Sequence, residues 1–125
     1  MDQDIYSEYV LEHARHPHNK KVMESYSVSA TLQNEGCADE LVAYLRIKNN
    51  IVEEVTFSGV GCAISTAAAS LFSMHIQGKS VVGVQTIAPG EVYTLLGVII
   101  HPMRSRCALL MYEAVQKALT QYVRN

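Results

Sequence analysis

The stretch Leu-Val-Ala-Tyr-Leu-Arg-Ile-Lys-Asn-Asn-Ile-Val-Glu-Glu-Val-Thr-Phe, residues 41–57, decides the fold. Its first half, residues 41–48, alternates apolar side chains with others at the period of two that marks a β-strand with one buried face. Asn49-Asn50 follows, and asparagine tolerates the positive φ of a tight turn. Residues 51–57 then return as the partner strand. This stretch therefore predicts an antiparallel hairpin.

A third strand is predicted just before the hairpin. Residues 28–32 alternate apolar and polar side chains and so have one apolar face. The loop between this strand and the next carries Cys37 and Asp39. Because the strands follow one another through short connections, we expect a three-stranded antiparallel meander.

Helices are predicted before and after the strands in the sequence. Residues 4–15 repeat apolar side chains with helical spacing, Asp4 is placed to cap the start, and Pro17 ends the helix by restraining the residue before it. After the strands the period changes from two to about 3.6. Residues 65–77 then predict an Ala-rich helix with Gly78 as its stop.

The C-terminal part is predicted to be helical. Residues 80–100 indicate one or two short helices around Pro89-Gly90, and the apolar run of residues 98–100 is expected to be core rather than a partner-binding edge. The last helix is the clearest element, with Ser105 as a suitable N-cap. Its apolar stripe consists of Cys107, Leu110, Met111, Ala114, Val115, Ala118, Leu119 and Tyr122.

Composition bounds the class of protein. A chain of 125 residues with 49% hydrophobic content can bury one core, and no repeat or linker divides it, so we expect a single domain over residues 1–125. The net charge of −2 and the scattered basic residues argue against nucleic acid as a partner. No apolar run approaches the roughly 20 residues that span a membrane, and the acidic start does not resemble a signal peptide. No phosphate loop, nucleotide fingerprint or Ser/His/Asp order supports a hydrolase or kinase.

Three cysteines and one aspartate are the candidate site residues. An odd number of cysteines cannot pair fully, and we expect a cytoplasmic protein in which reduced thiols serve as ligands or nucleophiles. Cys37, Cys62 and Cys107 with Asp39 make a set of three soft thiolates and one hard carboxylate. That mixture suits an iron–sulfur cluster or zinc that is bound and later released. Spacing alone does not show that the three cysteines converge, and each is also compatible with a buried apolar position.

Local sequence favours thiolate at two of these cysteines. Cys62 and Cys107 lie near the predicted starts of helices, where unpaired N–H groups stabilise negative charge, and Arg106 precedes Cys107. Gly59 and Gly61 precede Cys62 and either let the backbone approach a ligand closely or simply end the strand.

Histidines are weaker ligand candidates. His13, His16 and His18 cluster in the sequence around a proline, and we do not expect them to bind metal. His101, six residues before Cys107, is kept as a reserve ligand.

Five ordered motifs resemble the IscU/NifU-type (N-terminal NifU-like) iron–sulfur cluster assembly scaffolds, and together they run along nearly the whole chain. The motifs are Asp4-Ile5-Tyr6 through His13 with Pro17-His18-Asn19, then Cys37-Ala38-Asp39, Phe57 to Ser65, Gly78-Lys79-Ser80, and Arg106 to Leu110.

This resemblance implies an α+β fold in which a small antiparallel three-stranded sheet is packed by helices in a two-layer sandwich. It implies that Cys37, Cys62 and Cys107 cluster at one exposed end beside Asp39. In such scaffolds a PLP-dependent (pyridoxal-phosphate) cysteine desulfurase delivers persulfide sulfur, iron joins it, and a [2Fe-2S] cluster forms for transfer to carrier or recipient apoproteins. Zn²⁺ occupies the same ligands in the cluster-free state. The resemblance suggests Cys107 as persulfide acceptor and Asp39 as the ligand that keeps the cluster labile.

The chain departs from the family pattern at three places. Arg106 stands where many IscU-branch scaffolds have a histidine ligand; this is a SufU-like feature, although the long SufU insertion between the last two cysteines is absent. Residues 100–104 replace the Leu-Pro-Pro-Val-Lys segment that a dedicated heat-shock chaperone reads, which argues against that partnership. Ala38 replaces a glycine in the ligand loop.

Three functions remain open at this stage. The leading hypothesis is a scaffold that is not itself an enzyme. The second is a zinc-bound sulfurtransferase, or sulfur acceptor, of the SufU type that stimulates its desulfurase. The third is a structural zinc domain, which is disfavoured because structural zinc sites are more often closed sets of Cys and His.

Overall fold

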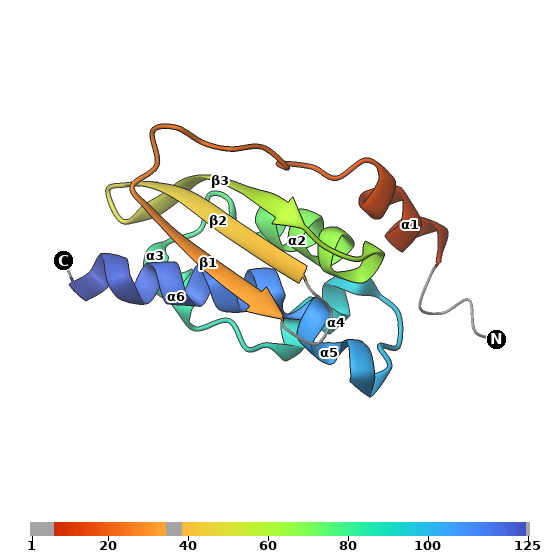
Figure 1. Ribbon diagram of the computed structural model, residues 1–125. Coiled ribbons are helices and arrows are strands. Elements are labelled where there is room, and N and C mark those ends of the chain that lie inside the picture. The colour runs from red at the N-terminus through yellow and green to blue at the C-terminus, as the bar shows by residue number, and fades with distance from the viewer. Residues whose placement is uncertain (1–6, 35–38, 125) are drawn as a thin grey trace.

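A computed structural model describes residues 7–34 and 39–124 of the chain (Figure 1). A 3-10 turn, Pro102–Arg104, precedes the last two helices. The other elements, in chain order, are α1 (Glu8–Arg15), β1 (Val28–Asn34), β2 (Asp39–Lys48), β3 (Ile51–Val60), α2 (Ala63–Ile76), α3 (Val81–Gln85), α4 (Gly90–Leu96), α5 (Ser105–Ala108) and α6 (Leu110–Arg124).

The three strands form the antiparallel sheet that the sequence predicts, in the order β1-β2-β3. Asn49 and Asn50 turn the β2–β3 hairpin with φ of 55° and 62°, the left-handed values that asparagine tolerates. All three strands are longer than predicted, and the extra residues lie at one end of the sheet. There β1 continues to Asn34 and β2 begins at Asp39, and these two residues are paired across the strands.

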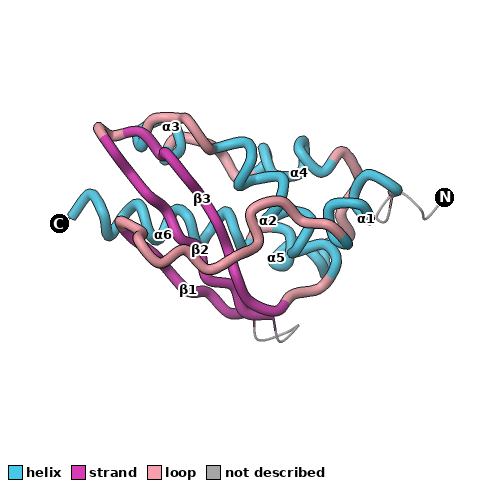
Figure 2. The backbone as a smooth tube through the Cα atoms, turned by 90° about the horizontal axis from the view of Figure 1, so that it is seen from above, coloured by secondary structure: helices cyan, strands magenta, loops and turns pink. Residues whose placement is uncertain are grey.

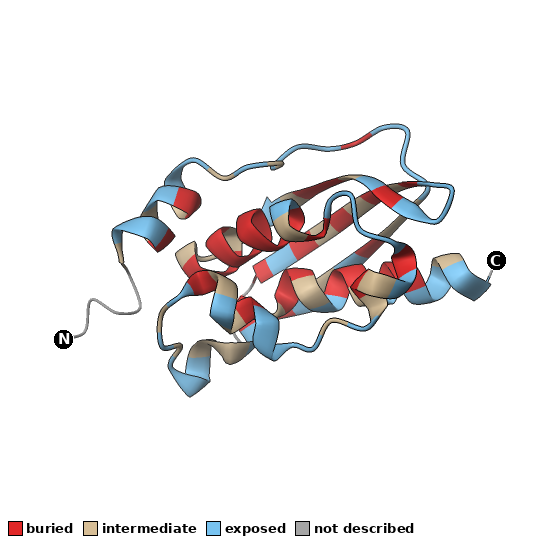
Figure 3. Ribbon diagram, turned by 180° about the vertical axis from the view of Figure 1, so that it is seen from behind, coloured by how far each residue is buried: buried red, intermediate tan, exposed pale blue. Residues whose placement is uncertain are grey.

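Two helices cover one face of the sheet. α6 packs against β1 and β2, α2 packs against β3, and the two helices also contact each other. Figures 1 and 2 show the strands as one layer and these helices as the second. The buried residues gather between the layers (Figure 3), so the two-layer α+β sandwich is confirmed.

α2 is the most enclosed element, which explains its composition. Besides β3 and α6 it contacts α1 and α4, so neighbours surround most of its circumference. Ten of its fourteen residues are buried, and most of these are alanine or serine. Small side chains let several elements approach one helix closely, and a helix enclosed in this way is apolar nearly all round.

The first helix begins later than predicted. α1 starts at Glu8, and its cap is the Ser7 hydroxyl, which accepts a hydrogen bond from the Val10 N–H at 3.3 Å. Asp4, the cap predicted from the sequence, lies outside the described residues. The helical spacing of apolar side chains predicted the helix correctly. Its first residue is set by the cap at Ser7, which the spacing does not reveal.

The long C-terminal helix is confirmed, but its predicted start is wrong. The polypeptide bends at Leu109 (φ −96°, ψ 2°), which separates the short α5 from α6. Ser105 is the first residue of α5 and not a cap. The capping side chain is His101, whose Nδ1 accepts a hydrogen bond from the Met103 N–H at 3.2 Å at the start of the 3-10 turn.

The segment between α2 and the last helices is helical as predicted, in the two pieces α3 and α4. Gly97, with φ of 71°, ends α4. The expectation that residues 98–100 are core is wrong for Ile99, which is 75% exposed, whereas Val98 and Ile100 pack against the core. No described helix is both long enough and apolar enough to cross a membrane.

A buried polar cluster holds α1 and the chain after it against α2. His13 Nδ1 lies 2.8 Å from Ser70 Oγ, which also accepts the His18 backbone N–H at 2.9 Å. Since the Ser70 oxygen already accepts that bond, its hydroxyl proton is available for donation to a neutral His13 ring. Burial first, and then the positive charge that His18 can carry, lower the pKa of His13, while Glu12 raises it.

Stability is therefore expected to depend on pH through His13. The folded state binds this proton less readily than the unfolded chain, so unfolding becomes more favourable as pH falls below the unfolded pKa of about 6.5. The free energy of unfolding should fall from pH 7 to pH 5 with a contribution below the about 1.4 kcal/mol per pH unit that one proton can give. Urea titrations of the wild type and His13→Gln across this range would measure it. Equal slopes in the two proteins would contradict the assignment.

Candidate metal centre

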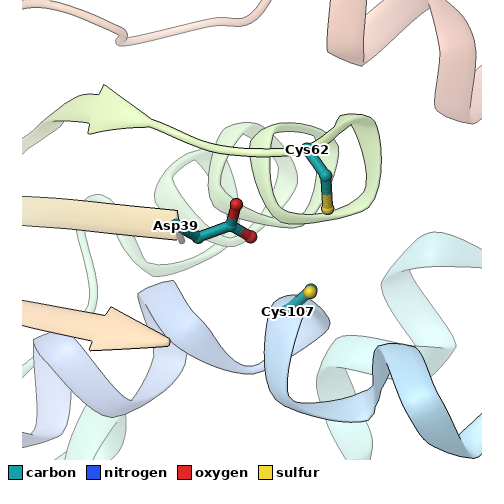
Figure 4. Close-up of side chains that lie close together, drawn as sticks. All are labelled: Asp39, Cys62 and Cys107. Carbon is teal, nitrogen blue, oxygen red and sulfur yellow. The ribbon is translucent and has the colours of Figure 1, made fainter. Parts of the chain in front are cut away.

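Three predicted site residues meet at the end of the sheet. Asp39 is the first residue of β2, Cys62 directly precedes α2, and Cys107 is the third residue of α5. A carboxylate oxygen and the two Sγ atoms all lie within 4.8 Å of one another. Figure 4 shows the three side chains turned toward one another from three separate elements. The structure thus provides the convergence that spacing alone could not.

The position of each residue follows from the local chain. Asp39 is held in the ladder by its pairing with Asn34. Cys62 sits in extended conformation (φ −73°, ψ 175°) at the N-terminal end of α2, as predicted. Cys107 lies in a four-residue helix before the bend at Leu109, so the prediction that it begins the long helix is wrong.

The site is more enclosed than expected. Cys107 has no exposed surface and Asp39 is 5% exposed, whereas Cys62 is half-buried. The expectation of an exposed cluster is therefore wrong for Cys107 and Asp39, and Cys62 is the more accessible of the two described thiols.

The Asp39 carboxylate suits a cation. Its Oδ2 is buried and makes no hydrogen bond within the described residues. A buried carboxylate oxygen needs a donor or a positive charge. Two thiol groups lie beside it, and thiolate and carboxylate together are ligands for zinc or iron. Around a tetrahedral ion these donors lie about 3.6–3.8 Å apart, so a contraction of at most about 1.2 Å from the 4.8 Å limit would close the group on a metal.

The remaining candidates fare differently. Cys37 lies outside the described residues, so its role as a ligand stays a prediction. His101 does not join the group found among the described residues, and its Nδ1 caps the 3-10 turn. Arg106 is exposed next to Cys107.

Both glycines before Cys62 lie close to neighbouring protein atoms, and at Gly59 the neighbour is backbone. Gly59 has φ of 124°, and a Cβ placed on it would lie 2.1 Å from the Glu40 backbone oxygen of the neighbouring strand. A Cβ on Gly61 would lie 2.2 Å from the Ser65 Oγ, which donates a hydrogen bond to the Cys62 carbonyl oxygen at 3.2 Å. The close approach is therefore to protein atoms, and the approach to a ligand suggested by the sequence stays a prediction.

One site residue was missed in the sequence. Asn34 is buried at the end of β1, and its Nδ2 lies 3.5 Å from Cys107 Sγ as a hydrogen-bond donor. The signal was the strand alternation itself, which places Asn34 on the same inward row as Ala30 and Leu32 if the strand is extended by two residues.

The fold and the site together define a small α+β protein with a cluster of two thiols and one carboxylate that could hold a metal ion. The protein-family model described as "NifU-like N terminal domain" matches residues 5–125 of the chain. The chain belongs to this family.

Two curated relatives are similar to the chain over nearly its whole length. The chain is 27% identical over 134 residues to the zinc-dependent sulfurtransferase SufU of Bacillus subtilis, covering 94% of this chain and 90% of the relative. It is 28% identical over 136 residues to the iron-sulfur cluster assembly scaffold protein IscU of Thermotoga maritima, covering 96% of each.

Solved structures share the fold. A putative iron-sulfur cluster assembly scaffold protein for the SUF system from Fervidobacterium islandicum matches with a TM-score of 0.82 at 24% identity, over 95% of this chain and 99% of that one. A NifU-like protein (N-terminal) from Brucella abortus also matches with a TM-score of 0.82, at 18% identity, over 98% of this chain and 97% of that one.

Gly59→Ala should destabilise the protein by at least about 2 kcal/mol, because it combines a strained φ with a backbone clash. Gly78→Ala is a matched control: its φ of 91° is also positive, but nothing lies within 4 Å of the new Cβ. Gly90→Ala, in a helix with open space around it, should be neutral or slightly stabilising. Chemical denaturation of the three variants measures the order. A Gly59 variant no less stable than the Gly78 variant would contradict the close approach.

Proposed function

We propose that this protein is a scaffold for iron–sulfur cluster assembly. It accepts persulfide sulfur from a PLP-dependent cysteine desulfurase, combines it with iron into a labile [2Fe-2S] cluster, and passes the cluster to carrier or recipient apoproteins. The observation that carries the proposal is the meeting of Asp39, Cys62 and Cys107 within 4.8 Å, with a buried carboxylate oxygen that makes no hydrogen bond among the described residues. Relatives named as scaffolds support it.

The ligand set explains how a cluster is held and released. Cys62 and Cys107, with Cys37 as the proposed third thiolate, are soft ligands that bind iron strongly. Asp39 is a hard oxygen ligand and a poorer match for a sulfur-bridged centre. A cargo held by three strong ligands and one weak one is released more readily than a cargo held by four thiolates.

Sulfur delivery is a thiol–persulfide exchange. A scaffold thiolate attacks the outer sulfur of the donor persulfide, a new S–S bond forms on the scaffold, and the donor cysteine leaves as a thiolate. Cys107 remains our proposed acceptor. Because its sulfur is covered, the chain around α5 must open when the desulfurase binds. The exposed Arg106 beside it is placed to attract the negatively charged donor.

The side chains on this end of the molecule offer contacts to a protein partner. Met103, four residues before Cys107, is 80% exposed, and Val60, two residues before Cys62, is also exposed. Exposed apolar side chains close to a site favour docking of another protein. The exposed turn at residues 101–103 lacks the segment read by the dedicated chaperone, so we do not propose that chaperone as a partner.

The enclosed site also favours a second function, a zinc-bound sulfur acceptor of the SufU type that stimulates its desulfurase. Two thiols and a carboxylate, with two of the three buried, suit resident Zn²⁺. The SufU relative is named as a zinc-dependent sulfurtransferase. In either function the thiols must stay reduced, so we propose a cytoplasmic location.

Anaerobic reconstitution tests the leading proposal. With ferrous iron, cysteine and a cysteine desulfurase, the wild type should give the absorbance and Mössbauer signature of a [2Fe-2S] cluster. Asp39→Ala should lengthen the cluster's lifetime several-fold, because it removes the hard ligand. Glu40→Ala, an exposed carboxylate next to it, is the matched control and should leave the lifetime unchanged. Tightly held zinc, no cluster and faster desulfurase turnover would support the sulfur-acceptor function instead.

Persulfide trapping tests the acceptor. After incubation with desulfurase and cysteine, alkylation and mass spectrometry should find the additional sulfur on Cys107 in the wild type. The amount of trapped persulfide should fall at least tenfold in Cys107→Ser, whereas Cys62→Ser should retain most of the wild-type amount. The reverse result would identify the more exposed Cys62 as the acceptor and overturn the role given to Cys107.

A further inference from the structure

We propose that Asn34 is a positioning residue for the metal-binding sulfur of Cys107. Its side-chain amide donates a hydrogen bond to Sγ, which orients that sulfur and withdraws negative charge from it when it binds a metal. The inference rests on the proposed function, because it concerns the same centre.

The first argument is the place of Asn34 in the sheet. It is the last residue of β1, on the inward row that also contains Ala30 and Leu32, and it is 6% exposed. The corresponding row of β2 starts with Asp39 and continues with Leu41. Both apolar rows therefore end in a polar residue on the same rung, at the point where the sheet meets the candidate metal centre.

The second argument is the cost of a buried amide. A side-chain amide on the core face of a strand is unfavourable unless its polar atoms find partners. An apolar residue would suit this row better for packing alone. The contact of Asn34 Nδ2 with Cys107 Sγ, at 3.5 Å, gives the amide nitrogen a partner on an element 73 residues away in sequence.

The chemistry fixes which way the amide faces. Sulfur bound to a metal has only lone pairs to offer, so the NH₂ group must point at it and the amide oxygen away. Hydrogen bonds to a charged acceptor are stronger than those between neutral groups. Such a donor therefore contributes most when Cys107 is a thiolate ligand, and groups that orient a ligand atom from behind tune the metal.

Charge transfer in the Co²⁺-substituted protein tests the effect. A hydrogen bond lowers the energy of the sulfur lone pair, so it raises the energy of sulfur-to-cobalt charge transfer. Asn34→Leu, which keeps the branched shape and the number of heavy side-chain atoms, and Asn34→Ala, which does not, should both move the near-ultraviolet band to longer wavelength. Gln33→Leu makes the same chemical change at the adjacent, exposed residue and should leave the band in place. A band shift in only one of the two Asn34 variants would depend on side-chain size and not on the lost amide donor, and would overturn the proposal.

A second cysteine background identifies the sulfur concerned. In Cys62→Ser the Asn34→Leu change should still shift the band, whereas in Cys107→Ser it should shift nothing, because the affected sulfur is gone. A shift that persists in Cys107→Ser would show that Asn34 does not act through Cys107 and would overturn the proposal. Wild-type protein that gives no thiolate–cobalt band would instead overturn the metal centre itself, so the two failures are distinguishable.

A measurement on the wild type alone covers the case in which the Asn34 variants do not fold. In protein loaded with ¹¹³Cd²⁺ and labelled with ¹⁵N, the hydrogen bond should transmit a scalar coupling from cadmium through Cys107 Sγ to the Asn34 amide protons. A cadmium resonance typical of thiolate ligands, together with this correlation, supports the proposal. The same cadmium resonance without the correlation overturns it.

Discussion

The antiparallel register of the three strands is the constraint on which the site depends. Pairing of Asn34 with Asp39, and of Leu41 with Gly59, brings the end of β1, the start of β2 and the end of β3 to one end of the sheet. A slip of β2 by one residue against its neighbours would turn Asp39 away from the core face and remove it from the thiols. The close approach at Gly59 fixes the second pair, because no larger residue fits there. The sheet is thus the frame for a site whose ligands come from separate parts of the chain.

Packing of the helices supplies the other half of the site. α2 is surrounded by α1, α4, α6 and β3, so the position of Cys62 at its start is fixed by contacts along its whole length. Cys107 is held differently, in a four-residue helix between a 3-10 turn and the bend at Leu109. A short element has few backbone hydrogen bonds to lose, and regions of this kind open more easily than long packed helices. The buried thiol therefore lies on the part of the site best suited to move.

Much of this architecture follows from the sequence, for identifiable reasons. The period of two over residues 41–48 and the Asn49-Asn50 turn predicted the hairpin, and the apolar stripe of the last helix predicted α6. Helix starts were predicted less well, since Ser7 and His101 cap where Asp4 and Ser105 were expected. A cap depends on the local path of the chain, which periodicity does not encode. Convergence of Cys62 and Cys107, and the burial of Cys107, depend on tertiary packing and were beyond any local pattern.

Two buried polar residues, Asn34 and Asp39, end the apolar rows of the sheet beside the candidate metal centre. Along β1 and β2 the inward rows are apolar until Asn34 and Asp39. Burying either polar side chain without a hydrogen-bond partner or a neighbouring charge would destabilise the fold. The amide finds the Cys107 sulfur, while one oxygen of the carboxylate has no hydrogen bond from the described residues. Stability alone would favour apolar residues at both positions. Their presence on one rung, with Asn34 against the Cys107 sulfur and Asp39 beside both thiols, is what the proposed metal centre requires.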